Sequence, residues 1–121
     1  MRFKDKVVLV TGGGQGIGET YAKSFSEEGA NVVIAELNEE NGERVASEIS
    51  QGAGKAIFVK TDVSSEQDAA AVANAAKEEF GGVDVLVNNA AIYHGMRYDT
   101  LLNVDLDYYM LIMKVNMHSP L

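Results

Sequence analysis

A chain of 121 residues is long enough to bury one hydrophobic core, and its composition, 46% hydrophobic and 23% charged, is typical of a folded domain. The formal net charge of -8 argues against a nucleic-acid partner or an anionic membrane surface, because such a field repels phosphate groups. The absence of cysteine excludes disulfides, thiolate metal sites and cysteine nucleophiles.

The first residues lead directly into a short apolar run, without the longer apolar segment and cleavage site of a signal peptide. No run approaches the length of a membrane span. We therefore expect a cytoplasmic protein with no membrane partner.

Apolar periodicity, together with Gly, Asn and Ser at the expected helix ends, predicts that strands and helices alternate along the chain. The expected elements are a strand at 7–10, a helix from Gly16 to about Glu28 followed by Gly29, a strand at 32–35, a helix capped by Asn38 and broken at 52–54, a strand at 56–59, a helix opened by Ser64 or Ser65 and ending at Phe80, a strand at 83–87, a loop at 93–103 and a last helix from Asp105. Four short buried strands joined by helices require parallel pairing. The sequence thus predicts an α/β, doubly wound sheet in one domain over residues 1–121. A Rossmann-type sheet has its first four strands in the order 3-2-1-4 and continues with further strands, so we expect this domain to be incomplete at its C-terminal side.

The first predicted strand is followed by a glycine-rich turn, TGGGQGIG, at residues 11–18. Gly12 would permit a tight turn, Gly16 would let a pyrophosphate approach the backbone, and Gly18 would allow close helix packing. The N-terminus of the following helix would then bind the pyrophosphate. The motif lacks the Lys and Ser or Thr of a Walker loop. The alternative is a flexible turn that binds no ligand.

An acidic residue, Glu36, ends the second predicted strand 20 positions after Gly16. The dinucleotide fold uses a carboxylate near this offset to bind the adenosine ribose hydroxyls. A carboxylate there repels the extra phosphate of NADP, and the neighbouring Leu37 and Gln15 offer no positive charge to receive it. NAD is therefore favoured over NADP. Alternatively, Glu36 caps or solvates a loop in an acidic stretch.

The turn TGGGQGIG, the pair Asp62-Val63 after the third strand and the run VNNAA at 87–91 together resemble the short-chain dehydrogenase/reductase family along the whole chain. The resemblance implies that Asp62 contacts the adenine amino group, that the Val63 backbone contacts the adenine ring, and that the segment from Asn89 runs past the ribose towards the nicotinamide. The family usually has Gly where this chain has Ala91, whose methyl narrows the groove. For Asp62 and Asn89 the alternative is a local turn or cap hydrogen bond. The full predicted cofactor-binding set is Gly12, Gln15, Gly16, Ile17, Gly18, Glu36, Leu37, Asp62, Val63, Asn89, Ala90, Ala91 and Ile92.

The pair Val115-Asn116 on the last helix resembles the Val-Asn pair of the same family, whose Asn is catalytic and holds a water in a proton relay. Its alternative is a solvated surface residue. The family also uses a Tyr as general acid/base, a Lys four residues later and a Ser that orients the substrate. No Tyr of this chain has Lys at that spacing. Tyr93 and Arg97 copy the spacing but fall in a loop, where we interpret them as surface residues.

The resemblance implies an oxidoreductase that transfers a hydride between NAD(H) and a small alcohol or ketone and that assembles as a homo-oligomer, with this chain alone inactive. The alternatives are a non-catalytic dinucleotide-binding module and a half-domain completed by a partner chain. The unpaired outer edge of the fourth strand favours a fragment of a longer protein. His94 and His118 are interpreted as a loop and a helix-end residue, and no metal site is predicted.

Overall fold

Four parallel strands form one sheet in the order β3-β2-β1-β4, which confirms the predicted doubly wound topology. The computed structural model describes residues 1–93, 95–100 and 102–121, so His94 and its predicted loop position lie outside the described residues. The elements are β1 (Val7–Thr11), α1 (Gly16–Glu27), β2 (Asn31–Glu36), α2 (Glu39–Gln51), β3 (Lys55–Lys60), α3 (Glu66–Phe80), β4 (Val85–Val87), α4 (Leu106–Met113) and a π-helical turn η1 (Lys114–His118).

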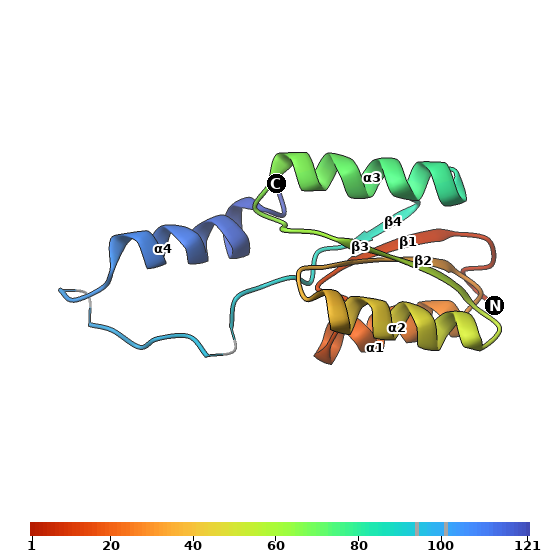
Figure 1. Ribbon diagram of the computed structural model, residues 1–121, viewed down its shortest axis with the longest axis horizontal. Helices are drawn as coiled ribbons and strands as arrows, with labels where there is room; N and C mark the ends of the chain where they lie inside the picture. Colours follow the sequence, from red (N-terminus) through yellow and green to blue (C-terminus); the bar gives the residue numbers. More distant parts are fainter. Residues whose placement is uncertain (94, 101) are drawn as a thin grey trace.

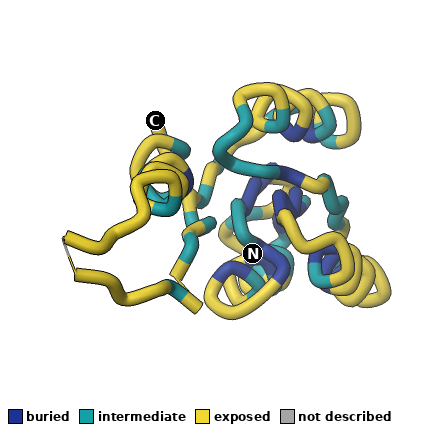
Figure 2. The backbone as a smooth tube through the Cα atoms, turned by 60° about the vertical axis from the view of Figure 1, so that its left-hand side comes forward, coloured by how far each residue is buried: buried dark blue, intermediate teal, exposed yellow. Residues whose placement is uncertain are grey.

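Helices cover both faces of the sheet, with α1 and α2 on one side and α3 on the other (Figure 1). Alternate residues of the central strands therefore face two different cores. One core joins Val8, Val10, Val32 and Ile34 to residues of α1 and α2, and the other joins Val7, Leu9, Val33 and Ala35 to Val72 and Ala76 of α3. The buried residues concentrate on these strands and on the inner faces of the helices (Figure 2).

The expectation of four fully buried strands is wrong for two of them. β1 and β2 are buried along almost their whole length, but β3 and β4 are half-buried. These two strands lie at the edges of the sheet, where each pairs with a single neighbour among the described strands. Their outer sides therefore lack the cover that the central strands receive.

The helix ends follow the predicted signals. The Asn38 side chain accepts the Asn41 N–H at 2.9 Å, and Ser65, rather than Ser64, caps α3 by accepting the Asp68 N–H at 3.2 Å. Gly29 follows α1 with a φ of +91°, in the left-handed region that glycine adopts most readily.

Two predicted elements differ from those observed. β4 spans three residues instead of 83–87. At the residue before it, Asp84, the carboxylate accepts the Val7 N–H at 2.8 Å and the backbone N–H donates to the Val7 carbonyl at 2.9 Å. The last helix is not continuous: α4 gives way to η1, where the Ser119 N–H reaches the Lys114 carbonyl at 3.0 Å.

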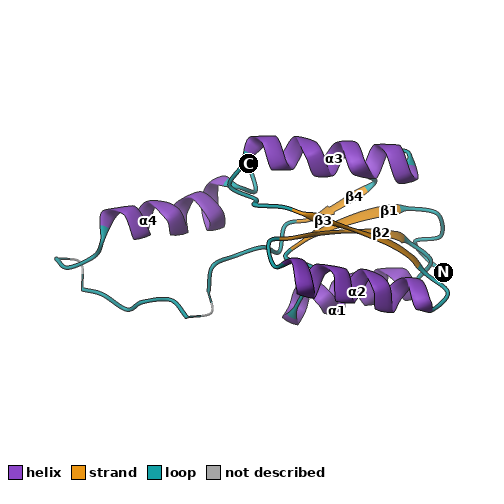
Figure 3. Cartoon of the chain, in the orientation of Figure 1, coloured by secondary structure: helices purple, strands orange, loops and turns teal. Residues whose placement is uncertain are grey.

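The α4 helix lies beyond the end of the sheet and is reached by a long loop after β4 (Figure 3). It buries none of its residues, and most of this part of the chain is exposed (Figure 2). Among the described residues, no helix has the length and apolar character needed to cross a membrane.

Candidate functional site

A groove of about 710 Å³ lies where the carboxyl ends of the strands meet. This is the crevice in which open α/β sheets bind ligands. Of the predicted residues, Gly18 and Asn116 do not line the groove. The lining comprises Gly12, Gln15, Gly16, Ile17, Glu36, Leu37, Asp62, Val63, Asn89, Ala90, Ala91 and Ile92, which were predicted, and Ala35, Thr61, Tyr93, Leu111 and Val115, which were not.

The glycine-rich turn needs glycine at three positions, two for their backbone conformation or open space and one for close packing. Gly12 and Gly16 have φ values of +65° and +55°. A Cβ at Gly16 would meet nothing within 4 Å, so the space beside it is open, whereas a Cβ at Gly18 would lie 2.1 Å from the Gly12 carbonyl oxygen. Gly18 is thus needed for packing. The residue before the first turn of α1, Gln15, makes no side-chain cap hydrogen bond, which leaves that turn's N–H groups without the cap that Asn38 gives α2.

Glu36 is 8% exposed and its carboxylate is held by two backbone N–H groups. Oε1 accepts from Gly14 at 3.0 Å, and Oε2 accepts from Asn38 at 3.0 Å. A carboxylate has about four lone-pair sites, so these two bonds fix its orientation and leave acceptor capacity towards the groove. Gly14 is a residue that the sequence interpretation missed: a Cβ there would lie 2.6 Å from the Glu36 Cγ.

Asp62 forms a local turn of the kind considered as its alternative role. Its Oδ1 accepts the N–H of Ser64 at 2.9 Å and the Ser64 hydroxyl at 2.6 Å. These bonds, the hydroxyl first, hold the pKa of the Asp62 carboxyl below its ordinary value, and the positive charge of Lys114 acts in the same direction. Both bonds go to Oδ1, so they do not use the second carboxylate oxygen. Asp62 still lines the groove.

Asn89 joins the end of β4 to the glycine-rich turn. Its Nδ2 donates to the carbonyls of Thr11 at 3.1 Å and Gly12 at 3.2 Å. In return, the Thr11 hydroxyl accepts the N–H groups of Asn89 and Ala90, both at 3.0 Å, and donates to the Val87 carbonyl at 3.4 Å. Thr11 was not predicted as a site residue. Its position as the first residue of the motif was the signal available in the sequence.

Asn116 lies in η1 and pairs with the backbone of Ile92. Its Oδ1 accepts the Ile92 N–H at 2.7 Å, and its Nδ2 donates to the Ile92 carbonyl at 3.0 Å. The side chain is therefore not merely solvated: it attaches the last helical segment to the segment that lines the groove.

The main-chain carbonyl of Asn116 accepts no hydrogen bond from the residues three to five positions later, which are the usual donors in a helix. Pro120, four residues later, has no N–H, and the N–H groups of Ser119 and Leu121 go to Lys114 and His118. Within residues 114–121, all of them described, this carbonyl oxygen is left available for water.

The Tyr93 and Arg97 pair does not form a joint site. The Arg97 guanidinium stacks 4.1 Å from the centre of the Tyr108 ring, and its backbone N–H donates to the Tyr108 hydroxyl at 3.0 Å. Arg97 thus attaches the loop to α4. In the described part of the chain, no three His, Cys, Asp or Glu side chains cluster closely enough to hold a metal ion.

Three comparisons relate the chain to known proteins. Residues 6–121 match the family model described as short chain dehydrogenase. An uncharacterized oxidoreductase of Mycobacterium tuberculosis is 51% identical over 114 residues, which cover 94% of this chain and 46% of that protein. A 2,5-dichloro-2,5-cyclohexadiene-1,4-diol dehydrogenase of Sphingobium indicum is 48% identical over 96 residues, 77% of this chain and 37% of that protein.

The fold is similar to that of a 3-ketoacyl-(acyl-carrier-protein) reductase from Brucella melitensis, solved in complex with NADH. The TM-score is 0.87 at 41% sequence identity, over 97% of this chain and 46% of that one. The chain therefore spans about half the length of the relatives it matches.

Proposed function

Because this chain belongs to the short-chain dehydrogenase family, we propose that it is the cofactor-binding half of an oxidoreductase that transfers a hydride between NAD(H) and a small alcohol or carbonyl compound. The observation that carries the proposal is the groove itself. It combines an open glycine position, the first turn of α1 without a side-chain cap, and a carboxylate fixed at the end of β2.

The groove fits a dinucleotide through its own chemistry. The pyrophosphate would lie against Gly16 and Ile17, where N–H groups and the helix dipole favour negative charge. The ribose hydroxyls would donate to Glu36, and Asp62 and Val63 would hold the adenine. The segment from Ala90 to Ile92 would continue towards the reactive ring.

The preference for NAD over NADP is argued from charge. Glu36 presents a carboxylate where the extra phosphate of NADP would lie, and the described residues that line the groove include no Lys or Arg. A phosphate there would meet a negative charge without a compensating one. The NADH in the Brucella melitensis structure supports the same assignment by similarity.

A nicotinamide cofactor held by the residues that line this groove would supply the hydride or accept it, and residues of the protein would have to move the accompanying proton. Asn116 contributes to that task indirectly. Its side chain fixes η1 to Ile92, and its carbonyl oxygen, which receives no backbone N–H within residues 114–121, would hold a water of the relay. We assign the titrating Tyr and Lys to further residues of the whole protein, because no Tyr of this chain has a Lys four residues later.

The test is the affinity of the full-length protein for NADH and NADPH, followed by cofactor fluorescence. The unmodified protein should bind NADH more tightly. Glu36→Ala should weaken NADH binding about tenfold, since it removes hydrogen bonds to a charged group, and should strengthen NADPH binding. Equal affinities in the unmodified protein would contradict the assignment.

Glu39→Ala is the matched control. Glu39 is a nearby acid at the start of α2, but its side chain is 61% exposed in a 3.7 Å ion pair with Lys60 and does not line the groove. This variant should keep both affinities. Turnover of secondary alcohols with NAD by the same full-length protein separates an enzyme from a non-catalytic dinucleotide-binding module.

A further inference from the structure

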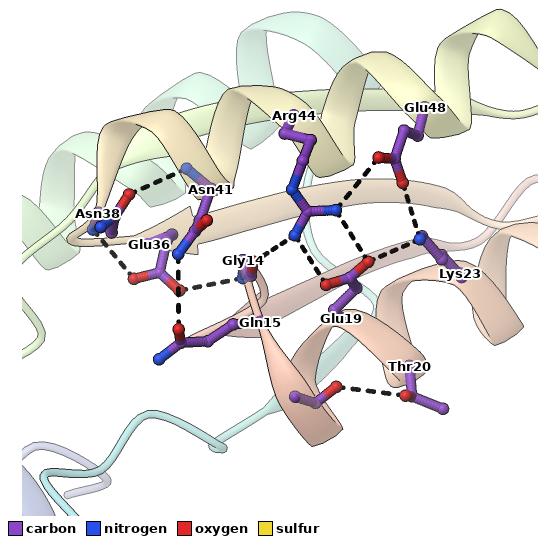
Figure 4. A network of polar contacts seen from close by, with 11 residues as sticks. Gly14, Gln15, Glu19, Thr20, Lys23, Glu36, Asn38, Asn41, Arg44 and Glu48 are labelled. Atoms are coloured by element: carbon purple, nitrogen blue, oxygen red, sulfur yellow. Dashed lines mark hydrogen bonds and ion pairs between the residues drawn. The ribbon is translucent and has the colours of Figure 1, made fainter. Parts of the chain in front are cut away.

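A network of charged side chains joins α1 to α2 directly behind the glycine-rich turn (Figure 4). Arg44 of α2 lies at its centre. Its guanidinium binds both carboxylate oxygens of Glu19 on α1, at 3.1 and 2.9 Å, and one oxygen of Glu48 at 3.1 Å. Lys23 binds the same two acids, at 2.6 Å and 2.8 Å.

One arm of Arg44 also reaches the turn. Nη2 of Arg44 donates to the Gly14 carbonyl at 3.2 Å, and the Gly14 N–H donates to the Glu36 carboxylate at 3.0 Å. Gly14 is thus held on one side by Arg44 and on the other by the carboxylate of the groove (Figure 4). A movement of this residue would change the direction from which Glu36 is held.

We propose that Arg44 is a positioning residue for cofactor selection: by fixing Gly14, it sets the orientation in which Glu36 meets the adenosine ribose. The inference rests on the proposed function, because it assigns Glu36 to the ribose hydroxyls. Arg44 does not line the groove itself and acts through the turn.

The geometry requires the planar fork of arginine. Nη1 and Nη2 each donate two hydrogen bonds, to the two acids and to Gly14, so the guanidinium bridges three partners that a lysine ammonium cannot reach in the same arrangement. The bonds from Arg44 and Lys23 lower the pKa of Glu19 from 4.5 to about 2, so its carboxylate stays charged and holds the guanidinium even below its ordinary pKa.

The same bonds prevent Arg44 from serving as a phosphate ligand. Both terminal nitrogens are already engaged, so a contact with the extra phosphate of NADP would have to break the bridge to Glu19 or Gly14. Arg44 therefore favours NAD and does not provide a positive charge for the extra phosphate of NADP.

The experiment compares three substitutions in the full-length protein. NADH and NADPH dissociation constants are measured by fluorescence titration, and thermal unfolding is recorded in parallel. Arg44→Met keeps the aliphatic stem and should weaken NADH binding about three- to tenfold, the effect of one hydrogen bond from a charged group, while NADPH binding is unchanged or stronger. The discrimination between the two cofactors therefore falls. Arg44→Lys should not restore it.

Lys23→Met is the matched control, because Lys23 shares both acids with Arg44 and, among the described residues, has no hydrogen bond or ion pair to the turn. It should keep the discrimination of the unmodified protein, even where its melting temperature falls as far as that of Arg44→Met. If Arg44→Met does not fold, Glu19→Gln, which loosens the arginine without touching Gly14, should shift the cofactor ratio in the same direction.

The outcomes separate the two proposals. An unmodified protein that binds neither cofactor contradicts the proposed function. An unmodified protein that prefers NADH, together with a folded Arg44→Met that keeps the same preference, overturns the positioning role alone. Restoration by Arg44→Lys, or a loss of NADPH affinity larger than that of NADH, also overturns it, because either result means that the charge of residue 44 acts directly.

Discussion

The Thr11 hydroxyl connects the ends of two neighbouring strands that are 78 residues apart in the sequence. It accepts the N–H groups of Asn89 and Ala90, and the Asn89 amide donates back to the Thr11 and Gly12 carbonyls. The glycine-rich turn and the segment after β4 therefore form one hydrogen-bonded unit. Both walls of the groove depend on it.

We expect Thr11→Val to lower the free energy of unfolding by about 1–3 kcal/mol, because it leaves two partly buried N–H groups without an acceptor while the side-chain volume is kept. Thr11→Ser retains the hydroxyl and should cost less. Urea unfolding of the full-length protein measures both. A loss in Thr11→Ser as large as that in Thr11→Val would contradict the prediction, because the serine variant keeps the hydroxyl that accepts the two N–H groups.

For single residues, the sequence predicts the roles that follow from backbone conformation and close packing. Gly12 and Gly18 were assigned their roles from the motif, and the observed φ of Gly12 and the contact at Gly18 agree with them. The bond that Gly14 donates to Glu36 and the bond that it accepts from Arg44 could not be predicted in the same way. They depend on how the glycine-rich turn, the end of β2 and α2 pack together, and the local sequence pattern does not indicate how close these elements come.

Among the elements, α1 and α2 are joined by charges as well as by their apolar faces. The carboxylate of Glu19 lies between Arg44 and Lys23, and its side chain is 20% exposed. The hydrogen bond from Arg44, followed by that from Lys23, lowers the pKa of Glu19 from 4.5 to about 2.

Folding favours the charged form of Glu19, so its stabilising contribution is complete above its ordinary pKa and is lost as the pH falls towards the folded-state value. We expect the free energy of unfolding to fall between about pH 5 and pH 2. Glu19→Gln should make that dependence shallower. Denaturant unfolding across the part of this range in which the protein stays folded tests the prediction, and parallel curves for the two proteins would contradict it.

Helix limits were predictable where side chains mark them, as Asn38 and Ser65 do for α2 and α3. The π-helical turn was not. It coincides with the pairing of Asn116 with Ile92 across 24 residues and with a proline that cannot continue the helix. The apolar periodicity of 106–113 continues an α-helix through this point and carries no sign of either contact.

At the scale of the molecule, the described strands leave the outer side of β4 open. Leu86, at the middle of this strand, is 55% exposed. An apolar strand edge with free N–H and carbonyl groups promotes pairing with other chains. The overall topology was predicted correctly because four apolar runs separated by helices admit few arrangements, whereas the unequal burial of edge and central strands depends on neighbours in space.

We expect the isolated 121-residue polypeptide to associate as its concentration rises, because the edge of β4 is open. We also expect it to show no NAD reduction with secondary alcohols, because it has no Tyr and Lys at the required spacing. Light scattering coupled to size-exclusion chromatography, with absorbance of NADH followed in parallel, measures both. Leu86→Lys places a charge on the open edge and should reduce association. Sustained turnover by a monomer would contradict the assignment of the acid and base to other residues.

The pairing of β4 with β1 also has a consequence for how the protein folds. β1, β2 and β3 join neighbours in sequence, but Val7 meets Asp84 across 77 residues, so β4 docks only after a long loop has closed. Loop closure of that length carries an entropic cost that the local units do not. The late contacts include those of Thr11 with Asn89, which complete the groove. We therefore expect competence to bind a cofactor to be acquired at the end of folding, when the most distant parts of the sequence meet, and not when the glycine-rich turn first forms.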